Sequence, residues 1–309
     1  EQEKQSEQSP RPRIIIDTDA NNELDDQHAL AYAYANREYF DIEGITVNNT
    51  RVGDGIEGQW KEAVRITRLF ELWPEMPVLK GAEGNYQDII GDREGSFDGK
   101  EAVDFIIEQS MDSTKSPLTI IALGKLTNLA LALDKDPGLK DRIRILWLGS
   151  NYPGPGEYNL VNDPPSLNRV LDSDVNFEMA LVAYGREDGT AAVTTSIETV
   201  RKDFPGMGPV ITDSIEGRNG GYFTNFGDYA VNLWENIELY GEGGLRSLFD
   251  LAAVVVLKHP GYAEWTKIPP SRYLNGQWEE VDYDQDSIVL IHNFKKDAIL
   301  IDFYRSLGR

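Results

Sequence analysis

The sequence predicts an α/β fold with an open, mostly parallel sheet, helices on both of its faces and extra helices toward the C-terminus. Over the first 185 residues, apolar runs alternate with helical patterns, as expected of parallel strands joined by right-handed crossovers. The first apolar run is followed by a dense acidic segment, at the place where open α/β sheets bind ligands. No Pro- or Gly-rich linker and no internal repeat divides the chain.

The individual elements follow from composition and periodicity. Short apolar runs predict five strands, at Arg13–Asp17, Ile42–Val47, Leu118–Leu123, Ile143–Gly149 and Met179–Tyr184. Helical patterns between them predict five helices, at Asp25–Arg37, Ile56–Leu72, Lys100–Met111, Leu126–Asp134 and Pro165–Ser173. The last of these starts suitably, because proline is tolerated in the first turn of a helix.

The remainder of the chain has a more helical pattern. Gly220–Tyr240 is rich in aromatic residues, Leu245–Lys258 is strongly apolar, and a closing strand at Ser287–His292 precedes a last helix. At the other end, residues 1–12 are polar and lack apolar periodicity, so they predict a disordered tail before a single domain over residues 13–309. The chain does not begin with Met, which favours an exported mature chain over a cytoplasmic one.

Composition excludes some partners and some chemistries. A net charge of −22 argues against nucleic acid and against an anionic membrane as partners. No apolar run approaches the roughly 20 residues of a membrane span. The absence of cysteine excludes disulfides and thiol catalysis.

The acidic segment after the first strand predicts a metal site. Four aspartates and a glutamate, at positions 17, 19, 23, 25 and 26, fall within ten residues. Carboxylates packed this closely repel one another unless positive charge lies among them. Oxygen ligands at this density suit Ca²⁺ or Mg²⁺.

Three other interpretations of the segment are an EF-hand loop, a phosphatase site and an acidic helix start. An EF-hand loop counted from Asp17 needs glycine and glutamate where the chain has Asn22 and His28, so it is excluded. An aspartyl-phosphate-type Mg²⁺ phosphatase also begins with a strand and an Asp-x-Asp pair, but the further lysine and acidic pair that it needs have no obvious counterpart. An acidic helix start would account for Asp25 and Asp26 alone.

Two further segments offer ligands for such a site. The loop after the fourth predicted strand carries Asn151, Glu157 and Asn159, and amides with a carboxylate suit a polyhydroxyl ligand. Asp250 is a lone carboxylate before an apolar run, and aspartate is rarely buried unless it is paired or bound to a metal.

Together these segments resemble the inosine-uridine-preferring nucleoside hydrolase family from about residue 13 to the C-terminus. The resemblance rests on Asp17-Thr18-Asp19, the Asp25-Asp26 pair, Leu126-Thr127-Asn128, and Asn151, Glu157-Tyr158-Asn159 and Asp163-Pro164 at the family's spacing. Each fragment alone is weak, whereas the combination is specific. It implies a nucleoside-hydrolase-like fold and a nucleoside substrate, and it favours a homodimer or homotetramer.

The resemblance also implies one Ca²⁺ and roles for particular residues. The metal ligands would be Asp19, Asp26, Asp250 and the main-chain carbonyl of Leu123. The ribose would be held by Asp25, Glu157 and Asn159, with Asn151 on its 5′ side. Asp19 would take the proton from a water acidified by Ca²⁺, with Asn48 (or Asn49) near that water, and the N-glycosidic bond would break through an oxocarbenium-like state.

The chain departs from the family pattern in two ways. Five residues rather than three separate Asp19 from Asp25, which introduces Asn22 and Glu23 at the ribose end or as an added ligand. The histidine that many members use to protonate the leaving base is replaced by Phe249. Phe249 and Tyr229 are candidates for stacking on a base. These departures leave open a second function, a catalytically silent Ca²⁺- and sugar-binding module.

Overall fold

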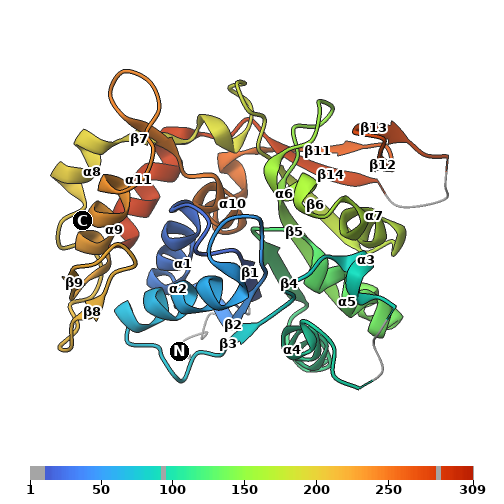
Figure 1. The fold of residues 1–309 in the computed structure, drawn as a ribbon. Coiled ribbons are helices and arrows are strands. Elements are labelled where there is room, and N and C mark those ends of the chain that lie inside the picture. The colour runs from blue at the N-terminus through green and yellow to red at the C-terminus, as the bar shows by residue number, and fades with distance from the viewer. Residues whose placement is uncertain (1–10, 92–94, 283–286, 309) are drawn as a thin grey trace, which may run out of the picture.

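The centre of the fold is a mostly parallel sheet. This computed structural model describes residues 11–91, 95–282 and 287–308. The eight strands lie in the order β11-β14-β6-β5-β4-β1-β2-β3 (Figure 1). Neighbours are parallel except at one edge, where β11 runs antiparallel to β14. The strands span Arg13–Thr18 (β1), Asp41–Val47 (β2), Val78–Lys80 (β3), Leu118–Ala122 (β4), Ile143–Gly149 (β5), Asn176–Leu181 (β6), Glu264–Ile268 (β11) and Ile288–His292 (β14).

Helices cover both faces of this sheet (Figure 1). One face carries helices at Asp25–Ala35 (α1), Gly55–Leu69 (α2), Phe226–Glu235 (α9), Phe249–Lys258 (α10) and Lys296–Ser306 (α11). The other carries Lys100–Ser110 (α4), Thr127–Lys135 (α5) and Pro164–Asp172 (α7). Short helices lie at Tyr86–Ile89 (α3), Tyr158–Asn162 (α6) and Ile197–Asp203 (α8).

The alternation of side chains along β1 links the two hydrophobic cores. Ile14 and Ile16 pack into the core with α1 and α10, whereas Ile15 packs into the core with α4 and α5. All three are fully buried, and each such side chain stabilises the fold by about 2 kcal/mol. The buried strand fixes where the chain leaves the sheet, and therefore where Asp19 lies.

Short antiparallel pairs of strands lie outside the main sheet. They join β12 (Ser271–Leu274) to β13 (Gln277–Glu280), β7 (Thr194–Ser196) to β10 (Leu245–Ser247), and β8 (Ile215–Glu216) to β9 (Tyr222–Phe223).

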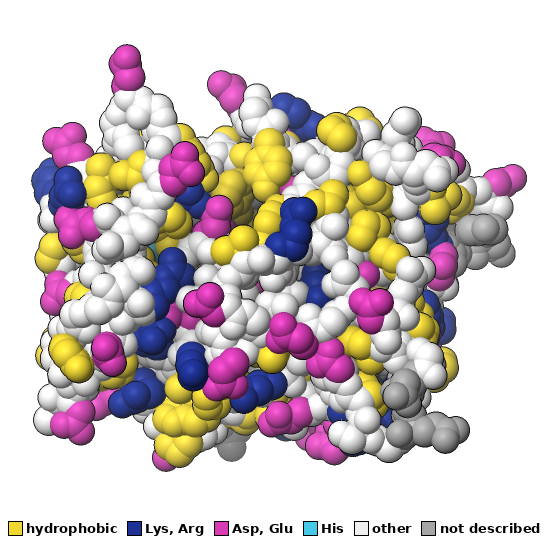
Figure 2. Space-filling model, in the orientation of Figure 1, with side chains coloured by type: hydrophobic (Ala, Val, Ile, Leu, Met, Phe, Trp, Pro, Cys, Tyr) yellow, Lys and Arg dark blue, Asp and Glu magenta, His cyan; other side chains and the backbone are white. Residues whose placement is uncertain are grey.

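Figure 2 shows acidic side chains spread over one face of the molecule, with lysine and arginine among them. Within the described ranges, no helix is both long and apolar enough to cross a membrane.

The predicted architecture is confirmed, with differences in detail. The strand predicted at Met179–Tyr184 begins and ends earlier, as β6, so Tyr184 follows it. The edge strands β3 and β11 were not predicted, and the predicted loop after β5 contains α6. The tail predicted over residues 1–12 lies outside the described residues except for Arg11 and Pro12.

Candidate active site

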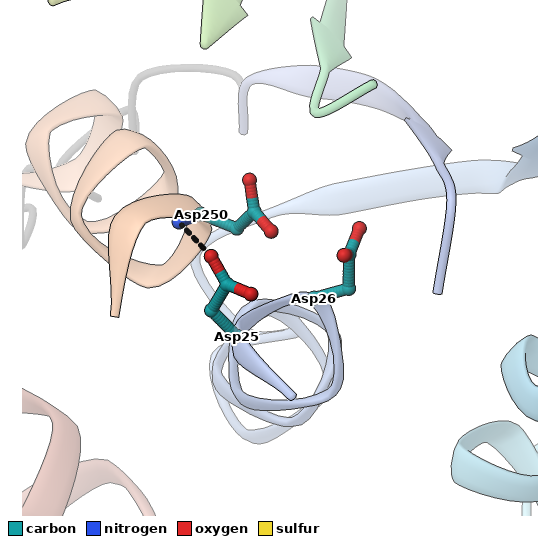
Figure 3. A group of neighbouring side chains, drawn as sticks. All are labelled: Asp25, Asp26 and Asp250. Carbon is teal, nitrogen blue, oxygen red and sulfur yellow. Dashed lines mark hydrogen bonds between the residues drawn. The ribbon is translucent and has the colours of Figure 1, made fainter. Parts of the chain in front are cut away.

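Three buried carboxylates converge where two helices begin. Asp25 and Asp26 lie in the first turn of α1, and Asp250 lies in the first turn of α10, which packs against α1. Figure 3 shows the three carboxylates grouped around one space. One oxygen of each lies within 4.8 Å of the others. The backbone N–H of Asp250 donates a hydrogen bond to Asp25 Oδ2 at 3.4 Å. Helix N-termini favour negative charge, which explains in part how the chain tolerates this cluster.

The electrostatics of the cluster call for a cation. Burial, with the charges of the neighbouring aspartates, raises the pKa values of Asp26 and Asp250 well above their usual range. Burial also raises the pKa of Asp25 to about 6, and the charge of Glu23 adds to this effect. Asp250 Oδ1 is buried and has no hydrogen-bond partner among the described residues. Hard oxygen donors that repel one another and include an unsatisfied atom fit a divalent cation.

Asp19 lies beside this cluster, just beyond the end of β1. It lines the same cavity as the three carboxylates but is not one of the group within 4.8 Å. Burial raises the pKa of Asp19 to about 7, the charge of Asp25 adds to the rise, and a hydrogen bond from Thr50 Oγ1 at 2.5 Å opposes it. A buried carboxylate beside a site for a cation is placed to accept a proton from a water molecule.

Asp17 does not line the cavity, but its hydrogen bonds hold neighbouring side chains in place. Its carboxylate accepts hydrogen bonds from Thr46 Oγ1, Asn48 Nδ2 and Asn128 Nδ2 at 2.6 to 2.7 Å. Burial raises its pKa to about 6. Asn48 Oδ1 has no hydrogen-bond partner in the described part of the chain, and Gly124 lies so close that a Cβ there would be 2.5 Å from this oxygen. Asp17 therefore holds the amide of Asn48 in one orientation against the backbone of Gly124.

The other wall of the cavity comes from the loop between β5 and α6. Glu157 is the N-cap of α6 and accepts hydrogen bonds from the backbone N–H groups of Ser150, Asn159 and Leu160 at 2.9 to 3.2 Å. Asn159 Nδ2 donates to the carbonyl oxygens of Leu123 (2.8 Å) and Leu148 (3.0 Å). A carbonyl oxygen has two lone pairs, so this bond still leaves Leu123 able to bind a cation.

The structure brings most, but not all, of the predicted site residues to one cavity. Eight line it, namely Asp19, Asp25, Asp26, Leu123, Glu157, Asn159, Phe249 and Asp250. Asn48, Asn151 and Tyr229 are not among the lining residues. Asn151 Oδ1 accepts a hydrogen bond from the backbone N–H of Tyr184 at 3.0 Å. The Tyr229 hydroxyl is buried and donates to Glu62 Oε1 at 2.6 Å.

The sequence did not single out several residues that line the cavity. Tyr158, Tyr184 and Tyr240 do so, together with Leu148 and Val182. Tyr184 follows β6, so its position after a strand was a signal that could have identified it. Tyr240 reaches the site through tertiary packing, and its sequence neighbourhood gives no such signal. Asn22 and Glu23, noted above as additions to the family pattern, also line the cavity.

The chain is similar in sequence to known proteins. The family model described as "Inosine-uridine preferring nucleoside hydrolase" matches residues 14–283. The chain is 27% identical over 188 residues to uridine nucleosidase 1 of Arabidopsis thaliana, and 29% identical over 190 residues to the pyrimidine-specific ribonucleoside hydrolase RihA of Salmonella paratyphi B. These matches cover 52% and 54% of this chain but only 53% and 59% of the relatives.

Solved structures match over a longer stretch. The purine-preferring ribonucleoside hydrolase from Gardnerella vaginalis has a TM-score of 0.72 at 20% identity, covering 96% of this chain and 98% of that one. A plant nucleoside hydrolase has a TM-score of 0.71 at 17% identity, with 96% and 99% coverage. Such likeness confirms the fold. With the family model matching most of its length, the chain belongs to the inosine-uridine preferring nucleoside hydrolase family.

Proposed function

We propose that this protein hydrolyses the N-glycosidic bond of ribonucleosides, releasing ribose and the free base, with Ca²⁺ as its cofactor. The observation that carries the proposal is the buried group of Asp25, Asp26 and Asp250, which shares a cavity with Asp19 and leaves Asp250 Oδ1 unsatisfied. The names of the relatives and solved structures, which are nucleosidases and nucleoside hydrolases, agree with it.

The residues of the cavity divide into a cation-holding set and a ribose-holding set. Asp19, Asp26, Asp250 and the carbonyl of Leu123 would hold Ca²⁺, with Asp25 close enough to contribute. When bound, the cation offsets the repulsion among the carboxylates and acidifies a water molecule. Amide and carboxylate oxygens pair with the donors of sugar hydroxyls, so Asn159 and the buried carboxylates provide the groups that a ribose requires.

The chemical step then follows from these positions. Asp19 accepts a proton from the attacking water, and the water oxygen bonds to the anomeric carbon while the bond to the base breaks. Positive charge develops on the sugar in the transition state, and the buried carboxylates stabilise it in surroundings from which water is largely excluded. Asn48 does not line the cavity, and its amide would act near the attacking water only from the orientation in which Asp17 holds it.

The test is ribose release from a panel of nucleosides by protein stripped with EDTA, before and after Ca²⁺ is restored. Calcium-restored release supports the proposal. Calcium binding with no release from any riboside would instead indicate the silent binding module. Phosphate ester turnover without nucleoside turnover would indicate the phosphatase. A homodimer or homotetramer is the accompanying proposal for the assembly, and light scattering on the purified protein measures it.

A further inference from the structure

The cavity offers no strong proton donor to a departing base. Among the described residues that line it, none is histidine, lysine or arginine. His28 is fully buried elsewhere, where its Nδ1 contacts the carbonyl of Leu24 at 2.6 Å and its Nε2 accepts from Trp234 Nε1 at 3.3 Å. His292 Nε2 pairs with Thr266 Oγ1 at 2.9 Å, on β14. A neutral base leaves poorly unless it is protonated, and general acids typically contribute about 10²- to 10⁴-fold to such steps.

The tyrosines at the cavity are weak acids. Burial raises the pKa of Tyr240 to about 12, and the charges of Glu23 and Asp25 add to the rise. Burial also raises the pKa of Tyr184, and there the charges of Glu157, Glu23 and Asp25 contribute. The same carboxylates that make these hydroxyls reluctant donors create a negative potential around the two rings.

The formal charge of the cavity is strongly negative. Six of its lining residues are acidic, namely Asp19, Glu23, Asp25, Asp26, Glu157 and Asp250. A divalent cation offsets two of these charges, and Arg246, which pairs with Glu23, offsets a third. The loaded site therefore stays negative, which favours a positively charged substrate.

Aromatic rings stand beside this charge. Tyr184 and Phe249 both line the cavity and meet edge to face, with ring centroids 6.0 Å apart and an interplanar angle of 88°. The ring of Tyr240 already makes a cation–π contact, because the guanidinium of Arg246 lies 4.6 Å from its centroid. Aromatic faces attract cations as well as stacking on flat rings.

Glu23 is held in place by residues outside the cavity. Arg246 donates from Nη2 to the Glu23 carboxylate, and Arg218 donates from Nη2 to its backbone carbonyl. Arg218 Nη1 also reaches the carbonyl of Asn21 at 3.4 Å. The side chain of Glu23 is 37% exposed, and Glu23 lines the cavity. The two extra residues in this segment thus place an ordered carboxylate, paired with Arg246, beside the aromatic rings.

We infer that the preferred substrates are ribosides whose leaving group is a flat, positively charged heterocycle, such as an N-ribosyl pyridinium or an N7-alkylated purine riboside. This inference rests on the proposed hydrolase activity and names the substrate class of the same site. Tyr184 and Phe249 receive the heterocycle, and the cavity carboxylates that neither the cation nor Arg246 offsets complement its charge.

The reaction balances without a proton donor. The bond between C1′ and the ring nitrogen breaks, and both of its electrons go to that nitrogen, which neutralises the heterocycle. The water oxygen bonds to C1′, and the proton that the water loses passes to Asp19 and then to solvent. Phe249, where many relatives carry a histidine, is then the appropriate residue, because it offers a ring to the cation and no proton is needed.

The experiment compares three kinds of riboside on the calcium-loaded protein. The ribosyl derivative of 3-carbamoylpyridinium is cationic and needs no proton, p-nitrophenyl riboside is neutral and needs none, and uridine and inosine are neutral and need one. We expect kcat/KM for the pyridinium riboside to exceed the values for uridine and inosine by about 100-fold or more. Equal or better turnover of uridine or inosine would overturn the inference and leave the hydrolase activity standing.

Two variants separate charge recognition from general damage. Glu23→Gln removes the carboxylate that offsets the charge of Arg246 beside the cavity. It should therefore lower kcat/KM for the pyridinium riboside about fivefold more than it lowers the value for p-nitrophenyl riboside. Glu242→Gln makes the same charge change at an exposed residue outside the cavity lining, and should leave both values unaltered. An equal loss on both substrates in Glu23→Gln would refute the role of Glu23. Failure to hydrolyse any of the ribosides would overturn the proposed function itself.

Discussion

Replacing one buried carboxylate of the cluster should stabilise the metal-free protein while destroying its activity. Asp25→Asn keeps the size of the side chain and an oxygen that can accept the hydrogen bond from the backbone N–H of Asp250. It removes a charge that burial and the charge of Glu23 make unfavourable. We therefore expect a higher melting temperature in EDTA and no ribose release.

The size of the effect follows from the pKa of Asp25. Its pKa is raised from an ordinary value of 3.8 to about 6 in the folded state. One pKa unit corresponds to about 1.4 kcal/mol, so the ionised form lowers the free energy of unfolding by about 3 kcal/mol. A raised pKa gives stability that is present below pH 3.8 and is lost as the pH rises through 6. The advantage of Asp25→Asn should thus be small at pH 4 and complete at pH 8, where it amounts to about 5 °C for a chain of 309 residues.

Calorimetry of the two proteins from pH 4 to pH 8 in EDTA measures this difference, with Asp213→Asn, at an exposed aspartate outside the cavity lining, as the control. Added Ca²⁺ should reverse the order, because the wild type gains more from binding. A melting temperature at pH 8 equal to or below that of the wild type in EDTA would refute the reasoning. It would mean that the cluster does not carry unfavourable charge when the cation is removed.

Four further outcomes are expected. Asp19→Ala should lower kcat about 10³-fold in nucleoside hydrolysis, and near-normal turnover would show that another group accepts the proton. Phe249→His should raise kcat/KM for inosine about tenfold by adding a proton donor, and an unchanged value would separate this position from the leaving group. Removing Ca²⁺ should lower the melting temperature, and Ca²⁺ at 100 times its Kd should restore about 2.7 kcal/mol, which calorimetry would detect. Burial lowers the pKa of His28 from 6.5 to about 4, so the unfolded state alone binds a proton between these values. Stability from His28 is therefore present above pH 6.5 and lost toward pH 4, by about 3 kcal/mol. His28→Gln should lack that loss in chemical denaturation.

The sheet was predictable because its central strands are local features of the sequence. Ile14, Ile15 and Ile16 are buried on both faces of the sheet, so the strand appears as an uninterrupted apolar run. The edge strands β3 and β11 are short or largely exposed and carry no such run. β6 was predicted too late along the chain because Val182 and Ala183 continue the apolar pattern after its last ladder residue. Burial alone does not distinguish a strand from a buried loop.

The site residues that the sequence predicted are those whose side chains are unfavourable in their surroundings unless a ligand is bound. Asp250 before an apolar run and five acids within ten residues are both unfavourable without a ligand, and both belong to segments that line the cavity. Tyr240 and Arg246 have no such conflict in sequence. Their position depends on β10 pairing with β7 and on the contact with Glu23, which only the folded chain establishes.

The hydrogen bond between Asp250 and Asp25 joins residues 225 positions apart. On a ribosome, α1 would emerge long before α10, and β14, which lies between β6 and β11, would emerge later still. Neither the cation site nor this edge of the sheet is complete until synthesis of the chain is nearly finished. Early segments would therefore expose two paired aspartates and an uncovered sheet face during translation. Such long-range pairing makes for slow folding. Calcium affinity in nascent chains of increasing length would report when the native topology closes.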